Sequence, residues 1–166
     1  VEGAVGERSN NERLKAALAD GTLDLVASDH SPAPPAIKEL ESGNLLKAWG
    51  GIAGLQFLLP ASWTALRGTL PLEQFIPLLT GAPARLLGLD GRKGFLRAGY
   101  DADLTIWQPE ASFRADISHL EHRHKISPYL ERELAGLVQY TFIGGDSVFS
   151  AGRLHQQPNG KWLFRK

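Results

Sequence analysis

The chain contains no cysteine and no methionine among its 166 residues. Without cysteine it can form neither disulfides nor thiolate metal sites. A native chain begins with Met unless it is processed, and Val stands at position 1. The missing methionine therefore leads us to expect a piece of a longer protein.

The sequence also lacks an excess of either charge and any long apolar run. Lys and Arg together number 18, as do Asp and Glu, so the formal net charge is zero. We therefore expect no nucleic acid and no membrane as partner, because no basic field is present to attract them and no apolar run reaches the roughly 20 residues of a membrane helix. With no targeting segment recognisable, we expect a cytoplasmic location. The 43% hydrophobic content is typical of a globular chain.

The pattern of apolar residues divides the chain near residue 90 into a helix-rich half and a strand-rich half. Periodicity near 3.6 predicts helices over 10–18, 55–66 (interrupted by Pro60), 72–79 and 84–87, the last opened by Pro83. Alternation predicts strands over 102–107 (ended by Pro109), 137–143 and 148–150, with a further strand beside a turn in 93–99.

The most informative segment precedes these helices. Residues 23–28 are an apolar run that ends in Asp29 and then in Ser31-Pro32. The run is typical of a buried strand with parallel neighbours, which would deliver the Asp29 carboxylate to its C-terminal tip among apolar walls. In barrel enzymes this is where catalytic groups lie, and a carboxylate there can bind a metal or move a proton. An ordinary Asp before a turn would look the same, and spacing alone favours that structural interpretation.

Two other groups are candidates for a site. His119, His122 and His124 have a spacing that could seat a metal, although a solvated loop among charged residues explains them better. The glycines of the loop 47–51 would let its backbone approach a planar amide ring. The alternative for this loop is a helix entry with Trp49 buried in the core, and both interpretations can hold together.

Three stretches together resemble the cyclic amidohydrolases of the dihydroorotase, hydantoinase and allantoinase group. Residues 80–106 look like the passage from the last barrel helix of that superfamily into its small β-domain. Residues 28–32, Ser-Asp-His-Ser-Pro, look like the end of the eighth barrel strand with its catalytic aspartate. The stretch from Lys47 to Phe57 resembles the allantoinase branch most. The resemblance extends from about Asn10 onward.

The resemblance implies an α/β fold class: the C-terminal part of a (β/α)8 metal-dependent hydrolase barrel together with part of a small β-sandwich. Residues 1–89 would hold the last barrel strand and the closing helices. Residues 90–166 would hold the sandwich subdomain and the C-terminal tail. Members of the group often form tetramers, so we expect the full-length form to be a homo-oligomer.

The resemblance also implies a reaction, the opening of a small cyclic ureide or amide (allantoin to allantoate) by two zinc ions and a bridging hydroxide. Asp29 would be both a metal ligand and the group that passes a proton to the leaving nitrogen. Ser31 and the loop residues Lys47, Ala48, Trp49 and Gly50 would lie against the substrate.

The remaining metal ligands of the group are a His-x-His pair, a carboxylated lysine and two further histidines, and no stretch here matches them. Because one carboxylate cannot hold two zinc ions, we expect the isolated chain neither to bind metal tightly nor to hydrolyse allantoin. We also expect marginal stability, since an apolar strand without neighbours leaves two unpaired edges. Two alternatives stay open: a dihydroorotase- or hydantoinase-type hydrolase, and a truncated non-catalytic relative that acts as an assembly partner.

Overall fold

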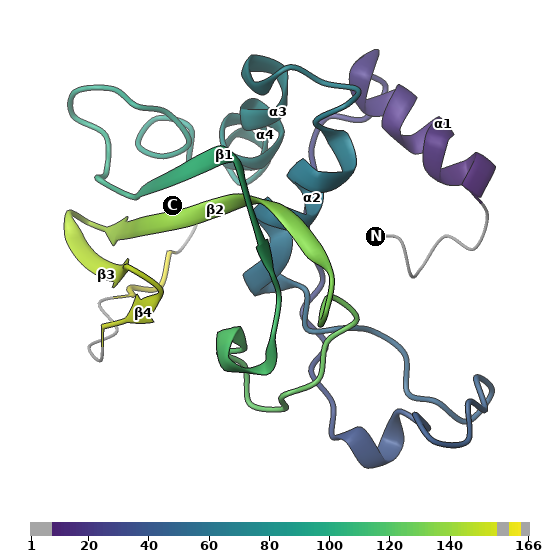
Figure 1. The fold of residues 1–166 in the computed structure, drawn as a ribbon. Coiled ribbons are helices and arrows are strands. Elements are labelled where there is room, and N and C mark those ends of the chain that lie inside the picture. The colour runs from purple at the N-terminus through teal and green to yellow at the C-terminus, as the bar shows by residue number, and fades with distance from the viewer. Residues whose placement is uncertain (1–7, 156–159, 164–166) are drawn as a thin grey trace.

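In the computed structural model, which describes residues 8–155 and 160–163, helices come first and strands follow. The helices are α1 (Arg8–Ala19), α2 (Leu58–Leu66), α3 (Leu72–Leu79) and α4 (Gly81–Leu86). The strands are β1 (Leu104–Arg114), β2 (Glu133–Ile143), β3 (Asp146–Ser150) and β4 (Arg153–Leu154). They form one antiparallel sheet in the order β1-β2-β3-β4, with α2 and α3 beside it and α1 at the periphery (Figure 1). These helices all precede residue 90, and these strands all follow it.

The helices lie where the periodicity predicted them, with two corrections that concern proline. A 3-10 turn at Leu55–Phe57 leads directly into α2, and Pro60 does not interrupt it. Pro83 lies inside α4 rather than opening it. Both prolines occupy the first turn of their helix, where the backbone N–H has no acceptor within the helix, so its loss is tolerated. Among the described residues, none of the helices combines the length and the apolar character needed to cross a bilayer.

The strand half differs from prediction at two places. Pro109 does not end β1, which continues to Arg114 with an irregularity between Gln108 and Ser112. Since β1 lies at an edge of the sheet, a residue without an N–H removes no ladder bond there. The predicted strand in 93–99 is wrong: those residues form turns, and the chain closes on itself where the Asp101 N–H donates to the Arg92 carbonyl at 2.9 Å.

The predicted strand over 23–28 is also absent. Backbone bonds run from the Leu23 N–H to the Ala17 carbonyl at 2.9 Å and from the Val26 N–H to the Leu78 carbonyl at 3.1 Å, and an isolated bridge joins His30 to Ala53. No strand lies beside it in the described part of the chain, so no ladder can form. The segment still leads from the core, where Val26 packs, to Asp29.

Aromatic side chains between α2, α3 and the sheet form the main core. The ring centroids of Trp63 and Phe75 lie 5.0 Å apart, and Trp107 meets Trp63 edge-on at 5.7 Å. Gly136 of β2 lies against both tryptophans with φ at +93°, a conformation that glycine adopts without strain. The Ala135 N–H donates to the Thr64 hydroxyl at 2.8 Å, which ties β2 to α2. This packing fixes the helical half on the sheet.

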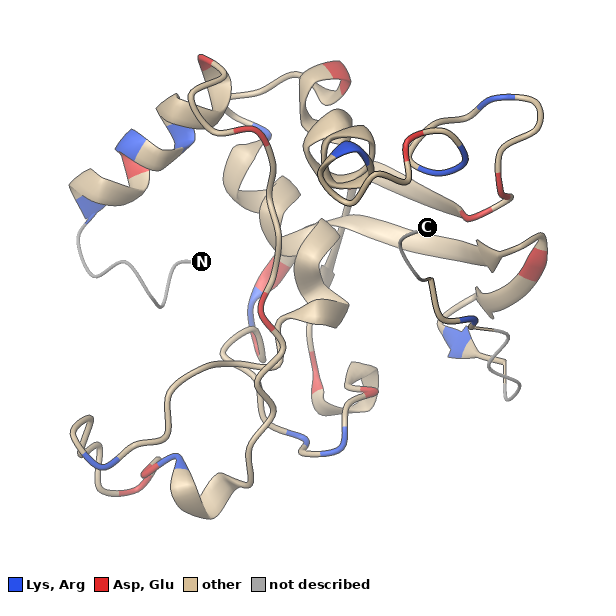
Figure 2. Ribbon diagram, turned by 180° about the vertical axis from the view of Figure 1, so that it is seen from behind, with Lys and Arg blue, Asp and Glu red and all other residues tan. Residues whose placement is uncertain are grey.

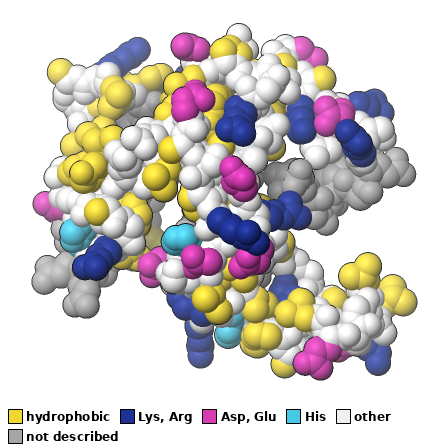
Figure 3. Space-filling model, in the orientation of Figure 1, with side chains coloured by type: hydrophobic (Ala, Val, Ile, Leu, Met, Phe, Trp, Pro, Cys, Tyr) yellow, Lys and Arg dark blue, Asp and Glu magenta, His cyan; other side chains and the backbone are white. Residues whose placement is uncertain are grey.

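The segment 31–52 projects from this core as a lobe (Figure 1). Its apolar side chains are largely exposed, 100% for Leu46 and 63% for Trp49. Figure 3 shows apolar atoms on the surface of the projecting lobe. The lobe therefore depends on its own hydrogen bonds rather than on burial for its conformation.

Candidate functional site

Asp29 lies at the junction between the core-anchored segment and the lobe. One carboxylate oxygen accepts the His30 N–H at 2.7 Å, and the other accepts the Ser31 hydroxyl at 2.9 Å. The carboxylate is exposed, so the apolar walls expected around it are not present in the described residues. Two donors on opposite oxygens hold the plane of the carboxylate and leave its remaining lone pairs free.

A second chain segment lies tightly against this tip. The Ser31 N–H donates to the Ile52 carbonyl at 2.8 Å. A Cβ added at Gly51 would lie 2.5 Å from the Ser31 Cβ, and one at Gly54 would lie 2.8 Å from the Asp29 carbonyl oxygen. Because real Cβ atoms do not approach so closely, glycine at both positions is a condition for this packing. Residues 51–54 thus form one wall of the Asp29 tip.

Lys38 organises the loop that leads into this wall. Its ammonium donates to the carbonyls of Trp49 and Gly50, each at 3.0 Å, and to that of Gly51 at 2.5 Å. On the other side, the Trp49 N–H donates to the Ile37 carbonyl at 2.8 Å. Lys38 is not among the predicted site residues, because nothing in the spacing of Lys38 and the loop indicates the contact.

The predicted substrate-binding residues differ in whether they contact Asp29 or the loop that Lys38 holds. Ser31 contacts Asp29 directly, and Trp49 and Gly50 belong to the loop that Lys38 holds. The N–H groups of Lys47 and Ala48 instead bond to Asn44, and no hydrogen bond or ion pair of the described residues joins either residue to Asp29. Trp49 is exposed, so the alternative of a core tryptophan is wrong.

The loop 117–125 approaches the same region from the strand-rich half. The His30 and His122 rings form a T-shaped pair with centroids 6.4 Å apart. Gln56 holds this loop at two points: its amide nitrogen donates to the His119 carbonyl, and its amide oxygen accepts the Glu121 N–H at 3.0 Å. Burial lowers the pKa of His122, because desolvation disfavours the charged imidazolium.

His119 and His122 of this loop have separate surroundings. His119 accepts the Asp116 N–H at 3.1 Å and packs against Phe113, whereas His122 faces His30. Within residues 8–155 and 160–163, no group of three or more His, Cys, Asp or Glu side chains is placed to hold a metal ion. The described residues of this chain therefore do not assemble a metal site by themselves.

Residues 92–103 form a charged turn between α4 and β1, where both signs of charge lie together (Figure 2). Arg92 donates twice to Asp101, and the Lys93 ammonium pairs with both Asp101 and Asp103. Asp103 also accepts the Gly144 N–H at 2.8 Å, which links the turn to the β2–β3 hairpin. Hydrogen bonds from Lys93 hold the pKa of both carboxyl groups below the ordinary value of 3.8. Residues 92–103, part of the stretch that resembles the amidohydrolases, thus serve to connect the helical half to the sheet.

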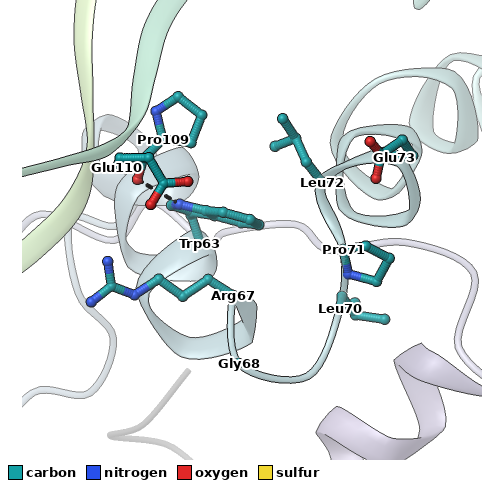
Figure 4. A pocket seen from close by; sticks show the side chains of 9 residues that line it. All are labelled: Trp63, Arg67, Gly68, Leu70, Pro71, Leu72, Glu73, Pro109 and Glu110. Atoms are coloured by element: carbon teal, nitrogen blue, oxygen red, sulfur yellow. Dashed lines mark hydrogen bonds between the residues drawn. The ribbon is translucent and has the colours of Figure 1, made fainter.

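A cleft of about 560 Å³ lies elsewhere, between the α2–α3 turn and β1. Figure 4 shows Trp63 crossing it, with its indole N–H donating to the Pro109 carbonyl at 2.9 Å. Arg67 and Glu110 are at one side of the cleft and Glu73 is at the other. None of the sequence-predicted site residues lines it, so the Asp29 tip remains the candidate site.

Comparison with known proteins places the chain in a family. The model of the amidohydrolase family matches residues 3–149. A probable allantoinase of Oryza sativa subsp. japonica is 43% identical over 149 residues, which are 88% of this chain and 29% of that protein. An allantoinase of Streptomyces avermitilis is 38% identical over 163 residues, 98% of this chain and 36% of that protein.

Among solved structures, an L-hydantoinase (dihydropyrimidinase) from Arthrobacter aurescens matches with a TM-score of 0.83 and 32% identity. The match covers 90% of this chain and 34% of that one, so the chain spans about a third of the length of its relatives. The likeness confirms the predicted fold class, part of an amidohydrolase barrel with a small antiparallel sheet. On these grounds the chain belongs to the amidohydrolase family.

Proposed function

We propose that this chain supplies the aspartate-bearing part of an enzyme that opens a cyclic ureide, converting allantoin to allantoate. The observation that carries the proposal is the arrangement at Asp29. Its carboxylate stands at the end of a core-anchored segment, is held by two donors and is walled by residues 51–54. The identity with two proteins named allantoinase over most of this chain supports the choice of substrate.

In the proposed reaction a water oxygen adds to a ring carbonyl carbon, the ring C–N bond breaks and the released nitrogen gains a proton. The Asp29 carboxylate accepts the proton from the attacking water and passes it to that nitrogen. The donors from His30 and Ser31 keep the carboxylate in one orientation during both transfers. Ser31 and the loop residues Lys47, Ala48, Trp49 and Gly50 border the substrate in this proposal.

We further propose zinc as the metal of the complete enzyme, two ions with Asp29 as one ligand. The described residues do not form a metal site alone, so in this proposal the other ligands lie outside the described residues. In the same proposal residues 1–89 close the barrel, residues 90–166 belong to the small sandwich, and the complete enzyme is a homotetramer. Residues 1–7, 156–159 and 164–166 of these two parts lie outside the described residues.

A chimera tests the proposal. This chain replaces the matching third of the Streptomyces allantoinase, and allantoin hydrolysis is measured with zinc. We expect activity in the chimera and none in the isolated chain. Asp29→Asn in the chimera should lower kcat by about 100-fold or more, the range that general acid–base groups contribute. Asp24→Asn, an exposed carboxylate on the same segment, serves as the matched control and should leave kcat unchanged.

Two other results would favour a different function for the chain. Hydrolysis of hydantoin, a dihydropyrimidine or dihydroorotate in place of allantoin would favour the alternative substrates, which the likeness to a solved L-hydantoinase supports. A folded chimera that hydrolyses none of these rings would favour a non-catalytic assembly partner.

A further inference from the structure

Lys38 makes an unusual set of contacts for a surface lysine. Its single nitrogen reaches the carbonyl oxygens of three successive residues, Trp49, Gly50 and Gly51. A lysine ammonium is a compact charge with three donors, so these carbonyls take up its full donor capacity. The side chain is half-buried and no carboxylate is paired with it in the described residues.

The loop conformation needs such a partner. Three successive carbonyl dipoles that converge on one point repel one another unless a cation lies between them. Gly51 permits the turn with φ at +74°, but its backbone freedom alone does not favour this conformation over others. The lobe also buries little apolar surface, since Leu45, Leu46 and Trp49 are exposed. The ammonium therefore stabilises the loop together with the bond from the Trp49 N–H to the Ile37 carbonyl.

The loop in turn contacts the Asp29 tip. Gly51 lies against the Ser31 side chain so closely that a Cβ would overlap it. The Ser31 N–H bonds to the Ile52 carbonyl, and the Ser31 hydroxyl donates to Asp29. A continuous series of contacts thus leads from Lys38 through the loop to the carboxylate.

We propose that Lys38 is a positioning residue: its ammonium sets the conformation of residues 49–51, and through Gly51 it fixes the Ser31 hydroxyl on Asp29. The catalytic meaning of this role rests on the proposed function of Asp29. The structural role does not, so the two can fail separately.

Amide hydrogen exchange of the 166-residue chain, followed by NMR, tests the proposal. In Lys38→Met the amides of Trp49 and Ser31 should exchange on the order of tenfold faster, because hydrogen bonds to a charged donor are lost at a partly exposed site. The Val26 amide, bonded to the Leu78 carbonyl in the core, should not change. Lys47→Met makes the same substitution and removes the same charge elsewhere in the lobe, and it should leave all three amides unchanged.

Two further variants complete the test. Lys38→Arg keeps the charge but spreads its donors over a planar fork, so exchange at Trp49 should remain faster than in the natural chain. In the chimera, Lys38→Met should lower kcat/KM for allantoin while the melting temperature stays the same. Unchanged exchange at Trp49 and Ser31, an equal rise at Val26, or full recovery by Lys38→Arg would each overturn the proposal. An inactive chimera with the expected exchange pattern would refute only the proposed function.

Discussion

Gly136→Ala should destabilise the chain strongly, because it adds one methyl group at the joint between α2 and the sheet. A non-glycine residue at φ +93° costs about 1–2 kcal/mol. The new Cβ would lie 2.9 Å from Cζ3 of Trp107 and 3.3 Å from Cδ1 of Trp63, both in the aromatic core. Overpacking of this kind costs about 1–3 kcal/mol. The free energy of unfolding should fall by roughly 2–5 kcal/mol in total.

Gly145→Ala provides the matched control. Gly145 has φ at +91°, but the nearest atom to an added Cβ is the Ala102 Cβ at 3.9 Å, so only the backbone term of about 1–2 kcal/mol applies. Urea unfolding followed by circular dichroism measures both variants. An equal loss in the two would show that the tryptophans yield easily and would refute the packing term. No loss in Gly136→Ala would refute the reasoning entirely.

Three further predictions concern contacts between distant segments. Lys93 keeps the pKa of Asp103 below 3.8, so the contribution of this carboxylate to stability is present above pH 3.8 and is lost as the pH falls through the lowered value. In Asp103→Asn the free energy of unfolding, measured with urea from pH 7 to 2, should therefore fall less steeply at acid pH. A loss in the mutant that is the same at every pH would contradict this. Lys93→Met should lower the free energy of unfolding at neutral pH and weaken the same dependence on acid pH. In the natural chain the pKa of Lys93 is raised, so the contribution of its ammonium to stability is lost only above pH 10.5. Gln56→Leu should increase amide exchange in residues 117–121, because Gln56 makes two hydrogen bonds to this loop. The exposed Gln74→Leu is the control, and the two variants should lower the urea midpoint equally. Equal exchange in both variants would show that Gln56 does not hold the loop.

Periodicity predicted the elements that are governed by local sequence. α1 and α3 lie where the helical period indicated them, and the hairpin of β2 and β3 lies where alternation indicated it. The wrong predictions concern residues whose conformation depends on neighbouring segments of the fold rather than on the local sequence. Pro109 is tolerated because β1 lies at the edge of the sheet, and 23–28 forms no ladder because no neighbouring strand is present in the described residues.

The candidate site was predictable only in part. The run ending in Asp29 and Ser31 indicated a carboxylate at a tip, and the structure brings these two side chains together. The Lys38 contacts with residues 49–51 were not predictable, because they depend on the course of an irregular lobe rather than on any period. Gln56 likewise contacts residues more than 60 positions away.

The hydrogen bond between Thr64 of α2 and the Ala135 N–H of β2 joins residues 71 positions apart, whereas each strand of the sheet pairs with the next along the chain. Loops between adjacent strands close quickly, and long closures are slower because they restrict more chain. We therefore expect the strand meander to form first during folding and α2 to dock afterwards. Until that docking, Trp63 and the apolar face of β2 remain open to water, which makes this interval the one in which the chain is most prone to associate with other copies.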